Sequence, residues 1–144
     1  MQIIGFNFTK ISAEKKSEFK QDENINTNIE FINLEKEKIE LLKDFEPIKL
    51  TFKFLVTYGN PEKKDNEEIK AEVSFEGNII LSTNKDESKE ILKSWKKKEL
   101  PNNFRLNIFN TILRKCSIKS LQLEEDLNLP HHVPLPALKL EKKD

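Results

Sequence analysis

The sequence predicts an α+β fold, in which a four-stranded antiparallel sheet is followed by two helices. Apolar and polar residues alternate through most of residues 1–83, which is typical of strands with one buried face. From residue 84 onward, apolar residues recur three and four positions apart, as on one face of a helix. A chain of 144 residues has the size of one domain. We therefore expect a single domain, with strands in 1–83, helices and a C-terminal strap in 84–140, and a frayed tail in 141–144.

The first strand is predicted from apolar residues that share one face: Ile4, Phe6 and Phe8. Ile11 and Ala13 continue the alternation in the opposite phase, which indicates a β-bulge near residues 9–10. The polar run over residues 15–24 is typical of a loop. The second strand begins near residue 25, and its face expected to be buried holds Ile25, Thr27, Ile29 and Phe31.

The third and fourth strands show the clearest alternation. Even positions from 48 to 58 are all apolar or aromatic, and odd positions from 69 to 81 are apolar or glycine. Residues 59–61 read Gly-Asn-Pro, which is typical of a turn. Residues 35–43 fit either a short helix or a continuation of the second strand. Antiparallel pairing of the four strands would bury one face of the sheet and leave the other polar.

Helix signals begin at Asn84, which Glu87 follows with the spacing of a capping box. The short apolar stripe of this helix consists of Ile91, Leu92 and Trp95. After Pro101, a longer helix is predicted from near residue 103 to about residue 127. Its apolar face holds Ile108, Phe109, Ile112, Leu113 and Cys116. Three prolines then favour extended chain, which predicts an apolar strap, residues 129–140, lying on the surface.

Composition argues against several classes of function. The 25 basic and 25 acidic residues balance to a net charge of zero, without the basic excess of a nucleic-acid binder. The single cysteine, Cys116, excludes an internal disulfide and a multi-cysteine metal site, and its place on an apolar helix face predicts a buried structural thiol. No apolar run approaches the ~18 residues that span a membrane, and the first residues lack the pattern of a signal peptide. We expect a cytoplasmic protein with neither a nucleic-acid partner nor membrane insertion.

No combination of residues predicts an enzyme, a cofactor site or a metal site. His131 and His132 are adjacent, so they would point to opposite sides of an extended segment, and we interpret them as a surface or turn pair. The three glycines are isolated, which argues against a phosphate-binding loop. Glu72 and Glu76 share the polar face of the sheet, where a solvated surface or a charged docking surface is expected.

Apolar residues are in surplus. The chain has ten phenylalanines, and Ile32, Leu55 and Ile80 interrupt the polar face of the predicted sheet. Two helices are too few to cover both faces. This excess predicts self-association, binding of an apolar client, or both.

Several short strings resemble the SecB family of protein-export chaperones, and they occur in the family's order. Residues 9–14 (Thr-Lys-Ile-Ser-Ala-Glu) resemble its first strand and 19–22 (Phe-Lys-Gln-Asp) the segment before its second. Residues 71–73 (Ala-Glu-Val) resemble the centre of its fourth strand. Residues 114–116 (Arg-Lys-Cys) resemble part of its long helix, and 127–130 (Leu-Asn-Leu-Pro) the strap that follows.

The resemblance implies an ATP-independent holdase, which binds unfolded polypeptides in apolar grooves without a cofactor. It implies dimers whose sheets join edge to edge, and a homotetramer with the helices packed between the sheets. Together with the strand pattern, it predicts the client-binding residues Ile25, Ile29, Phe31, Val73, Phe75, Phe109, Leu129, Val133 and Leu135. Glu14 and Glu72 match two acidic sheet positions through which the family docks on the SecA motor.

Other interpretations stay open. Some SecB-like proteins accompany toxin–antitoxin systems and protect a single antitoxin, and this sequence does not separate such a dedicated partner from a general chaperone. Each proposed client-binding residue could equally be an ordinary core residue. A small enzyme or ligand-binding domain would need convergent polar groups, which the sequence does not reveal.

Overall fold

The computed structural model describes residues 1–37, 45–59, 69–138 and 140. Its elements are β1 (Gln2–Lys15), β2 (Ile25–Lys36), β3 (Glu46–Gly59), β4 (Ile69–Thr83), α1 (Lys85–Trp95) and α2 (Asn102–Asp126). The expected α+β class, a four-stranded antiparallel sheet followed by two helices, is confirmed. β2 continues to Lys36, which favours the strand interpretation at the start of the ambiguous segment 35–43. The rest of that segment, the turn predicted at Asn60 and Pro61, and the tail 141–144 lie outside the described residues.

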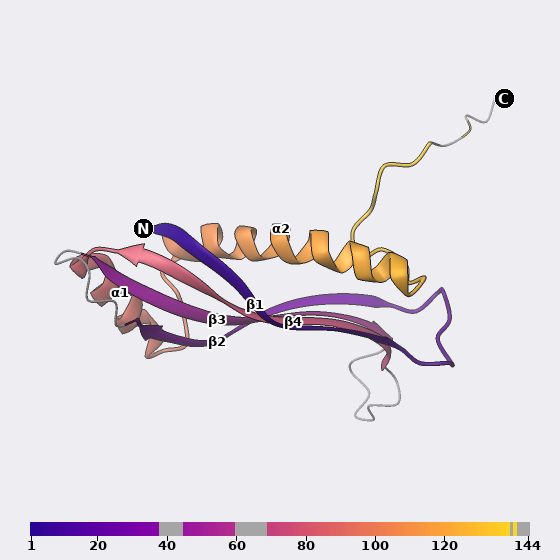
Figure 1. Ribbon diagram of the computed structural model, residues 1–144, viewed down its shortest axis with the longest axis horizontal. Helices are drawn as coiled ribbons and strands as arrows, with labels where there is room; N and C mark the ends of the chain where they lie inside the picture. Colours follow the sequence, from indigo (N-terminus) through magenta and orange to yellow (C-terminus); the bar gives the residue numbers. More distant parts are fainter. Residues whose placement is uncertain (38–44, 60–68, 139, 141–144) are drawn as a thin grey trace.

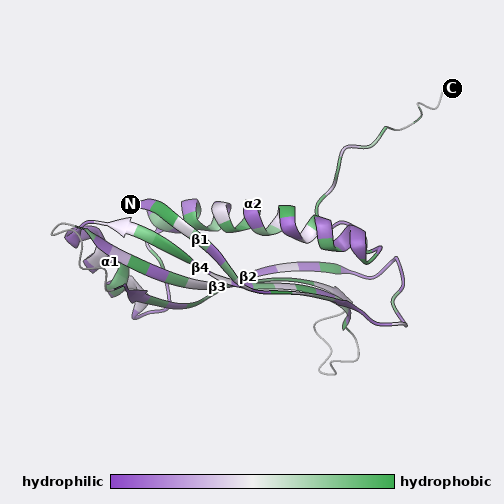
Figure 2. Cartoon of the chain, in the orientation of Figure 1, coloured by the Kyte–Doolittle hydropathy of each residue, from purple (hydrophilic) through white to green (hydrophobic). Residues whose placement is uncertain are grey.

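The strand order in the sheet is β1-β4-β3-β2, and every neighbouring pair is antiparallel. β1 and β2 are therefore the two edge strands. In Figure 1, α2 lies along one face of the sheet, and α1 lies at the end of the sheet where β4 finishes. Figure 2 shows the alternation of hydrophilic and hydrophobic residues along the strands.

The core lies between α2 and the inner positions of β3 and β4. From those two strands it takes Ile48, Leu50, Phe52, Phe54, Val56, Tyr58, Ala71, Val73, Phe75, Ile79 and Leu81. From α2, the buried positions are Phe104, Ile108, Ile112, Cys116, Ser120 and Glu124. These six positions lie four residues apart, which is slightly more than one helical turn. The buried line therefore winds around α2, as a helix needs when it packs on a twisted sheet.

Bulges in the edge strands change which side chains face the core. The bulge predicted near residues 9–10 is confirmed by a register shift between Phe8 and Lys10. A second shift, between Ile3 and Gly5, places one extra residue in β1 and leaves Ile4 51% exposed. The prediction that Ile4 shares a face with Phe6 and Phe8 was therefore wrong, because a bulge reverses the alternation.

Both predicted helices are present, and their ends have local causes. At the start of α1, the side chain of Asn84 accepts a hydrogen bond from the Glu87 N–H (2.8 Å), and the Glu87 carboxylate accepts one from the Asn84 N–H (3.2 Å). The predicted capping box is thus confirmed. At the end of α2, Asn128 adopts a positive φ of 53°, and the Leu129 N–H bonds to the Glu124 carbonyl (2.8 Å). This turn sends the chain back toward the sheet.

The strap divides into two parts, only one of which lies on the body of the protein. Leu129 is buried, with 4% exposure, and the side chain of His132 is only 1% exposed. Beyond Val133 the chain extends away from the sheet and the helices (Figure 1), and Leu138 is fully exposed. The prediction of a strap lying on the surface therefore holds only for its first residues. None of the helices described is long and apolar enough to cross a membrane.

Candidate functional site

An apolar strip lies on edge strand β2, on the side of the sheet that faces α2. It consists of Ile25, Ile29 and Phe31, and we call it the β2 strip. Its members stand directly opposite Tyr58, Phe54 and Phe52 of β3. Ile25 is 36% exposed, and the other two are half-buried. In the described part of the chain, β2 pairs only with β3, so the strip lies beside unpaired backbone N–H and C=O groups.

Such a strip can bind an extended apolar segment in two ways. The side chains can contact apolar side chains of the segment, and the strand edge can pair with its backbone. Backbone pairing does not depend on the sequence of the bound segment. The combination therefore suits ligands that share extended, apolar character but not a particular sequence.

Three of the predicted client-binding residues, Val73, Phe75 and Leu129, belong to the core instead. Val73 and Phe75 are fully buried at odd positions of β4. The ring of Phe75 stacks on Phe54, with centroids 5.9 Å apart, and also contacts Phe8 at 5.5 Å. A client could reach these side chains only if α2 left the sheet. Alternation placed both on an apolar face, but did not show that α2 covers that face.

Phe109 lies in a separate apolar patch near the start of α2. It borders a cavity of about 420 Å³ that is also lined by Asn102, Arg105 and Leu106. Leu106 is 67% exposed, and no member of the β2 strip lines this cavity. The patch is therefore a second exposed apolar surface and a candidate contact between subunits.

The predicted strap residues occupy three environments. Leu129 is buried, Val133 is half-buried and Leu135 is 48% exposed. The sequence grouped them because the prolines favour an extended apolar strap. The structure shows instead that exposure rises along the strap.

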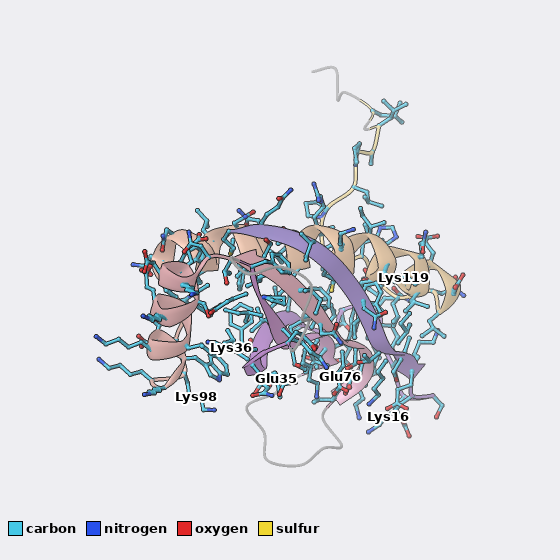
Figure 3. All side chains as sticks on the ribbon, turned by 60° about the vertical axis from the view of Figure 1, so that its left-hand side comes forward. Lys16, Glu35, Lys36, Glu76, Lys98 and Lys119 are labelled. Carbon is cyan, nitrogen blue, oxygen red and sulfur yellow. The ribbon has the colours of Figure 1, made fainter. Side chains whose placement is uncertain are left out.

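The two acidic residues expected to dock a partner lie together. Glu14 and Glu72 are direct neighbours across β1 and β4, on the face of the sheet turned away from α2. Four residues along β4 from Glu72, on the same face of the sheet, Glu76 (labelled in Figure 3) stands between Lys10 of β1 and Lys53 of β3.

The charge pattern on this outer face is therefore uneven. Glu76 stands opposite a lysine on each side, whereas Glu14 and Glu72 stand opposite each other across the ladder. Both line a shallow pocket of about 300 Å³ that also includes Lys16 and Lys70. The pocket therefore brings two carboxylates and two lysines together on the outer face, where a charged partner group can dock.

A buried polar group at the end of α2 was missed by sequence reasoning. The Glu124 carboxylate is fully buried and accepts hydrogen bonds from the His132 backbone N–H (2.8 Å) and from the Ser120 hydroxyl. One of its oxygens lies 2.7 Å from His132 Nδ1. The other ring nitrogen, Nε2, lies 3.1 Å from the Ser117 hydroxyl. We call Ser117, Ser120, Glu124 and His132 the Glu124 network.

The two histidines, expected to form a surface or turn pair, lie in different environments. His131 fits the expectation, since it is partly exposed and pairs with the exposed Glu125. The His132 side chain is only 1% exposed, so its predicted surface role was wrong. A signal for its partner was present in the sequence: Ser120 and Glu124 continue the four-residue spacing of Ile112 and Cys116, which places Glu124 on the buried line of α2.

The network also sets the ionisation of its neighbours. Burial alone would raise the pKa of Glu124, but the hydrogen bonds from His132 and Ser120, together with the charge of His132, outweigh it and hold that pKa below the usual range. The Tyr58 hydroxyl donates to the Pro130 carbonyl (2.5 Å). Burial, with a smaller contribution from the Glu124 charge, raises the pKa of Tyr58 well above its usual value. The carboxylate is thus charged, and the phenol neutral, near neutral pH.

Ser117, His132 and Glu124 are spaced like the side chains of a hydrolase triad, but the setting does not support that chemistry. Ser117 lies inside α2, where backbone N–H groups bond to carbonyls one turn earlier and cannot form an oxyanion hole. Burial raises the pKa of Cys116 to about 12, so this thiol is a poor nucleophile. Among the described residues, no group of three or more His, Cys, Asp and Glu side chains could hold a metal ion. The network is best explained as a structural lock.

Comparisons of the chain with protein-family models, with curated proteins and with solved structures gave no match.

Proposed function

We propose that this protein is a SecB-like, ATP-independent holdase that binds unfolded polypeptides. The observation that carries the proposal is the β2 strip, in which partly exposed apolar side chains lie along an unpaired strand edge. The quoted strings that resemble the SecB family, and the order of strands and helices, support the same activity. No cofactor is needed, since holding depends on burial of apolar surface and on backbone pairing.

Energetics favour an assembly of several subunits. At roughly 25 cal/mol per Å², 100 Å² of buried apolar client surface contributes about 2.5 kcal/mol. Association itself costs an estimated 4–15 kcal/mol, before the client chain is ordered. One short strip is therefore a weak site, whereas several strips acting on one client bind by avidity. We propose a homotetramer, built as a dimer of dimers, which would also cover the patch around Leu106 and Phe109.

Two further features belong to the proposal. Glu14 and Glu72 would dock a basic surface of a partner such as a SecA-like motor, because the two carboxylates stand side by side on the outer face of the sheet. The activity would take place in the cytoplasm, where export chaperones of this type meet their clients.

The experiment is an aggregation-suppression assay with reduced, unfolded proteins and no nucleotide. The parent protein should keep several unrelated clients in solution. The variant Ile25→Asp with Ile29→Asp should lose most of this activity while keeping its circular dichroism spectrum. Ile118→Asp is the matched control, since Ile118 is an apolar residue of α2 that is 58% exposed and is not a member of the strip.

The outcomes separate the candidate functions. Equal activity of the strip variant and the parent would exclude the β2 strip as the binding surface. Protection of one antitoxin, without protection of unrelated clients, would identify a dedicated partner of a toxin–antitoxin system. Light scattering at micromolar concentration should give about four subunit masses, and a stable monomer would contradict the proposed assembly.

A further inference from the structure

The first residues of the strap cover one end of β3. The His132 ring packs edge-on against Phe54, with centroids 6.0 Å apart. The carbonyl of Pro130 accepts the hydrogen bond from Tyr58. Phe54 and Tyr58 are both fully buried. Leu129–His132 therefore acts as a cover over two large apolar side chains of the sheet.

The covered residues are the direct continuation of the β2 strip. In the sheet register, Ile29 stands opposite Phe54 and Ile25 stands opposite Tyr58. Directly opposite residues lie on the same face of the sheet, with side chains in contact range. If the cover were lifted, the strip at the edge and the two β3 side chains, with Phe19 still against the Tyr58 ring (centroids 5.8 Å apart), would form one apolar surface that is two strands wide.

The cover is fixed at both of its ends by polar contacts. Near its start, Lys15 Nζ bonds to the Leu127 carbonyl (2.6 Å), and the Gln21 side chain bonds to the Asn128 carbonyl (3.1 Å). At its far end, His132 is bound by Glu124 through both its backbone N–H and its ring. Asn128 has a left-handed backbone conformation, which places the turn that leads into the cover at the end of α2.

Beyond His132 the strap has no comparable attachment within the described residues. Exposure rises from half-buried Val133 to 48% at Leu135 and to full exposure at Leu138. Within the described residues, the Glu124 network is thus the last attachment of the strap to the rest of the protein. Releasing it would free the cover from its C-terminal side.

We propose that Leu129–His132 is a lid, that the Glu124 network is its latch, and that opening the lid extends the client-binding surface from β2 onto β3. This inference deepens the proposed holdase function and rests on it. The latch is polar and specific, whereas the surface beneath the lid is apolar. A subunit can therefore keep Phe54 and Tyr58 covered when no client is bound, and present them when the lid opens.

Thiol labelling of the full-length protein tests the lid. In the first reporter protein, Leu129→Cys supplies the only thiol, because Cys116 is replaced by alanine. In the second, Leu129 is kept, and native Cys116, which is fully buried on α2, reports on opening of the core. His132→Gln should raise the labelling rate of the Leu129→Cys thiol at least about tenfold, since loss of one partner from a buried charged pair is strongly destabilising. Labelling of Cys116 should change far less. Ser117→Ala is the milder latch variant, and His131→Gln, outside the network, is the control.

The labelling results decide the first part of the proposal. Faster labelling of the lid thiol alone, in His132→Gln and to a lesser degree in Ser117→Ala, supports local opening. Equal acceleration at Leu129→Cys and Cys116 would show that the network stabilises the whole core and that no separate lid exists. If His132→Gln does not fold, Ser117→Ala and the parent still give this comparison. No change in any latch variant overturns the latch.

Client holding decides the second part. Latch variants that label faster should bind a reduced, unfolded client at least about threefold more tightly, as expected when the competent state was only partly populated. Open-lid variants with unchanged client affinity would show that the covered surface takes no part in binding. Absence of holding in every protein, with the labelling pattern intact, would instead contradict the proposed function and leave the local opening established.

Discussion

In its N-terminal half, α2 buries Phe104, Ile108 and Ile112 against the sheet, whereas in its C-terminal half the same line of positions buries Ser120 and Glu124. The apolar half is stabilised by burial, which needs no particular partner. The polar half is stable only while His132 satisfies Glu124. One helix therefore combines a firm anchor with an end whose stability depends on a single side chain of the strap.

The largest effect is expected in the apolar half. Ile112→Ala removes a fully buried side chain and leaves a cavity that the packed sheet cannot fill. The free energy of unfolding should fall by about 2–5 kcal/mol, measured by urea denaturation. Ile118→Ala, at a position on α2 that is 58% exposed, is the control and should change it by less than about 0.5 kcal/mol. A loss below about 1 kcal/mol for Ile112→Ala would mean that this half is not the anchor.

The polar half should behave differently when one or both partners are replaced. His132→Leu leaves the Glu124 carboxylate without its main partner, and we expect a loss of about 1–3 kcal/mol, since an opened lid lets water reach the charge. Adding Glu124→Leu should restore stability to within about 1 kcal/mol of the parent, as replacing both ends of a buried ionic pair often does. Urea denaturation of the four proteins of this double-mutant cycle measures the coupling. Additive losses from the two substitutions would contradict a pairwise lock.

Acid should weaken the polar half first. The pKa of Glu124 is lower in the folded protein than its usual value of 4.5, so its contribution to stability is present above that value and is lost as the pH falls through the lowered pKa. The groups that face it are His132 of the strap, Ser120 of α2 and Tyr58 of β3. The slope of unfolding free energy against pH below 4.5 should be smaller in Glu124→Gln than in the parent. Identical slopes would show that other carboxylates cause the acid sensitivity.

The smallest effect is expected at Cys116, where the apolar and polar halves meet. Cys116→Ala removes one buried sulfur atom from a site with 0% exposure, and we expect a loss of about 1 kcal/mol. Client holding should be unchanged, because burial keeps the thiol protonated, with its pKa raised to about 12. Loss of holding at unchanged stability would indicate that the thiol takes part in binding.

Local features of the fold followed directly from the sequence. The strand predicted over 48–58 is β3 (Glu46–Gly59), and the helix predicted from 103 to 127 is α2 (Asn102–Asp126). Alternation, the capping box at Asn84 and the bulge after Phe8 involve residues within a few positions of one another. Patterns of this range are visible in a sequence because the chain forms them without distant partners.

The candidate site was predicted only in part. Ile25, Ile29 and Phe31 were correctly placed on one face of a strand, and the structure adds that this strand is an edge. Glu14 and Glu72 were selected separately, and the antiparallel register brings them together. Periodicity alone did not distinguish this edge strip from Val73 and Phe75, which have the same alternation beneath α2.

By itself, the sequence determined the α+β class, the approximate extent of the strands and helices, and most of the apolar face of each, since these depend on interactions along a few residues of chain. Only the tertiary structure decided the strand order β1-β4-β3-β2, the face that α2 covers and the burial of His132. The His132 ring contacts Phe54, which is 78 residues away in the sequence, and Ser117, which is 15 residues away. Contacts of this kind depend on how α2 and the strap pack on the sheet, and the residue pattern within one segment does not reveal them.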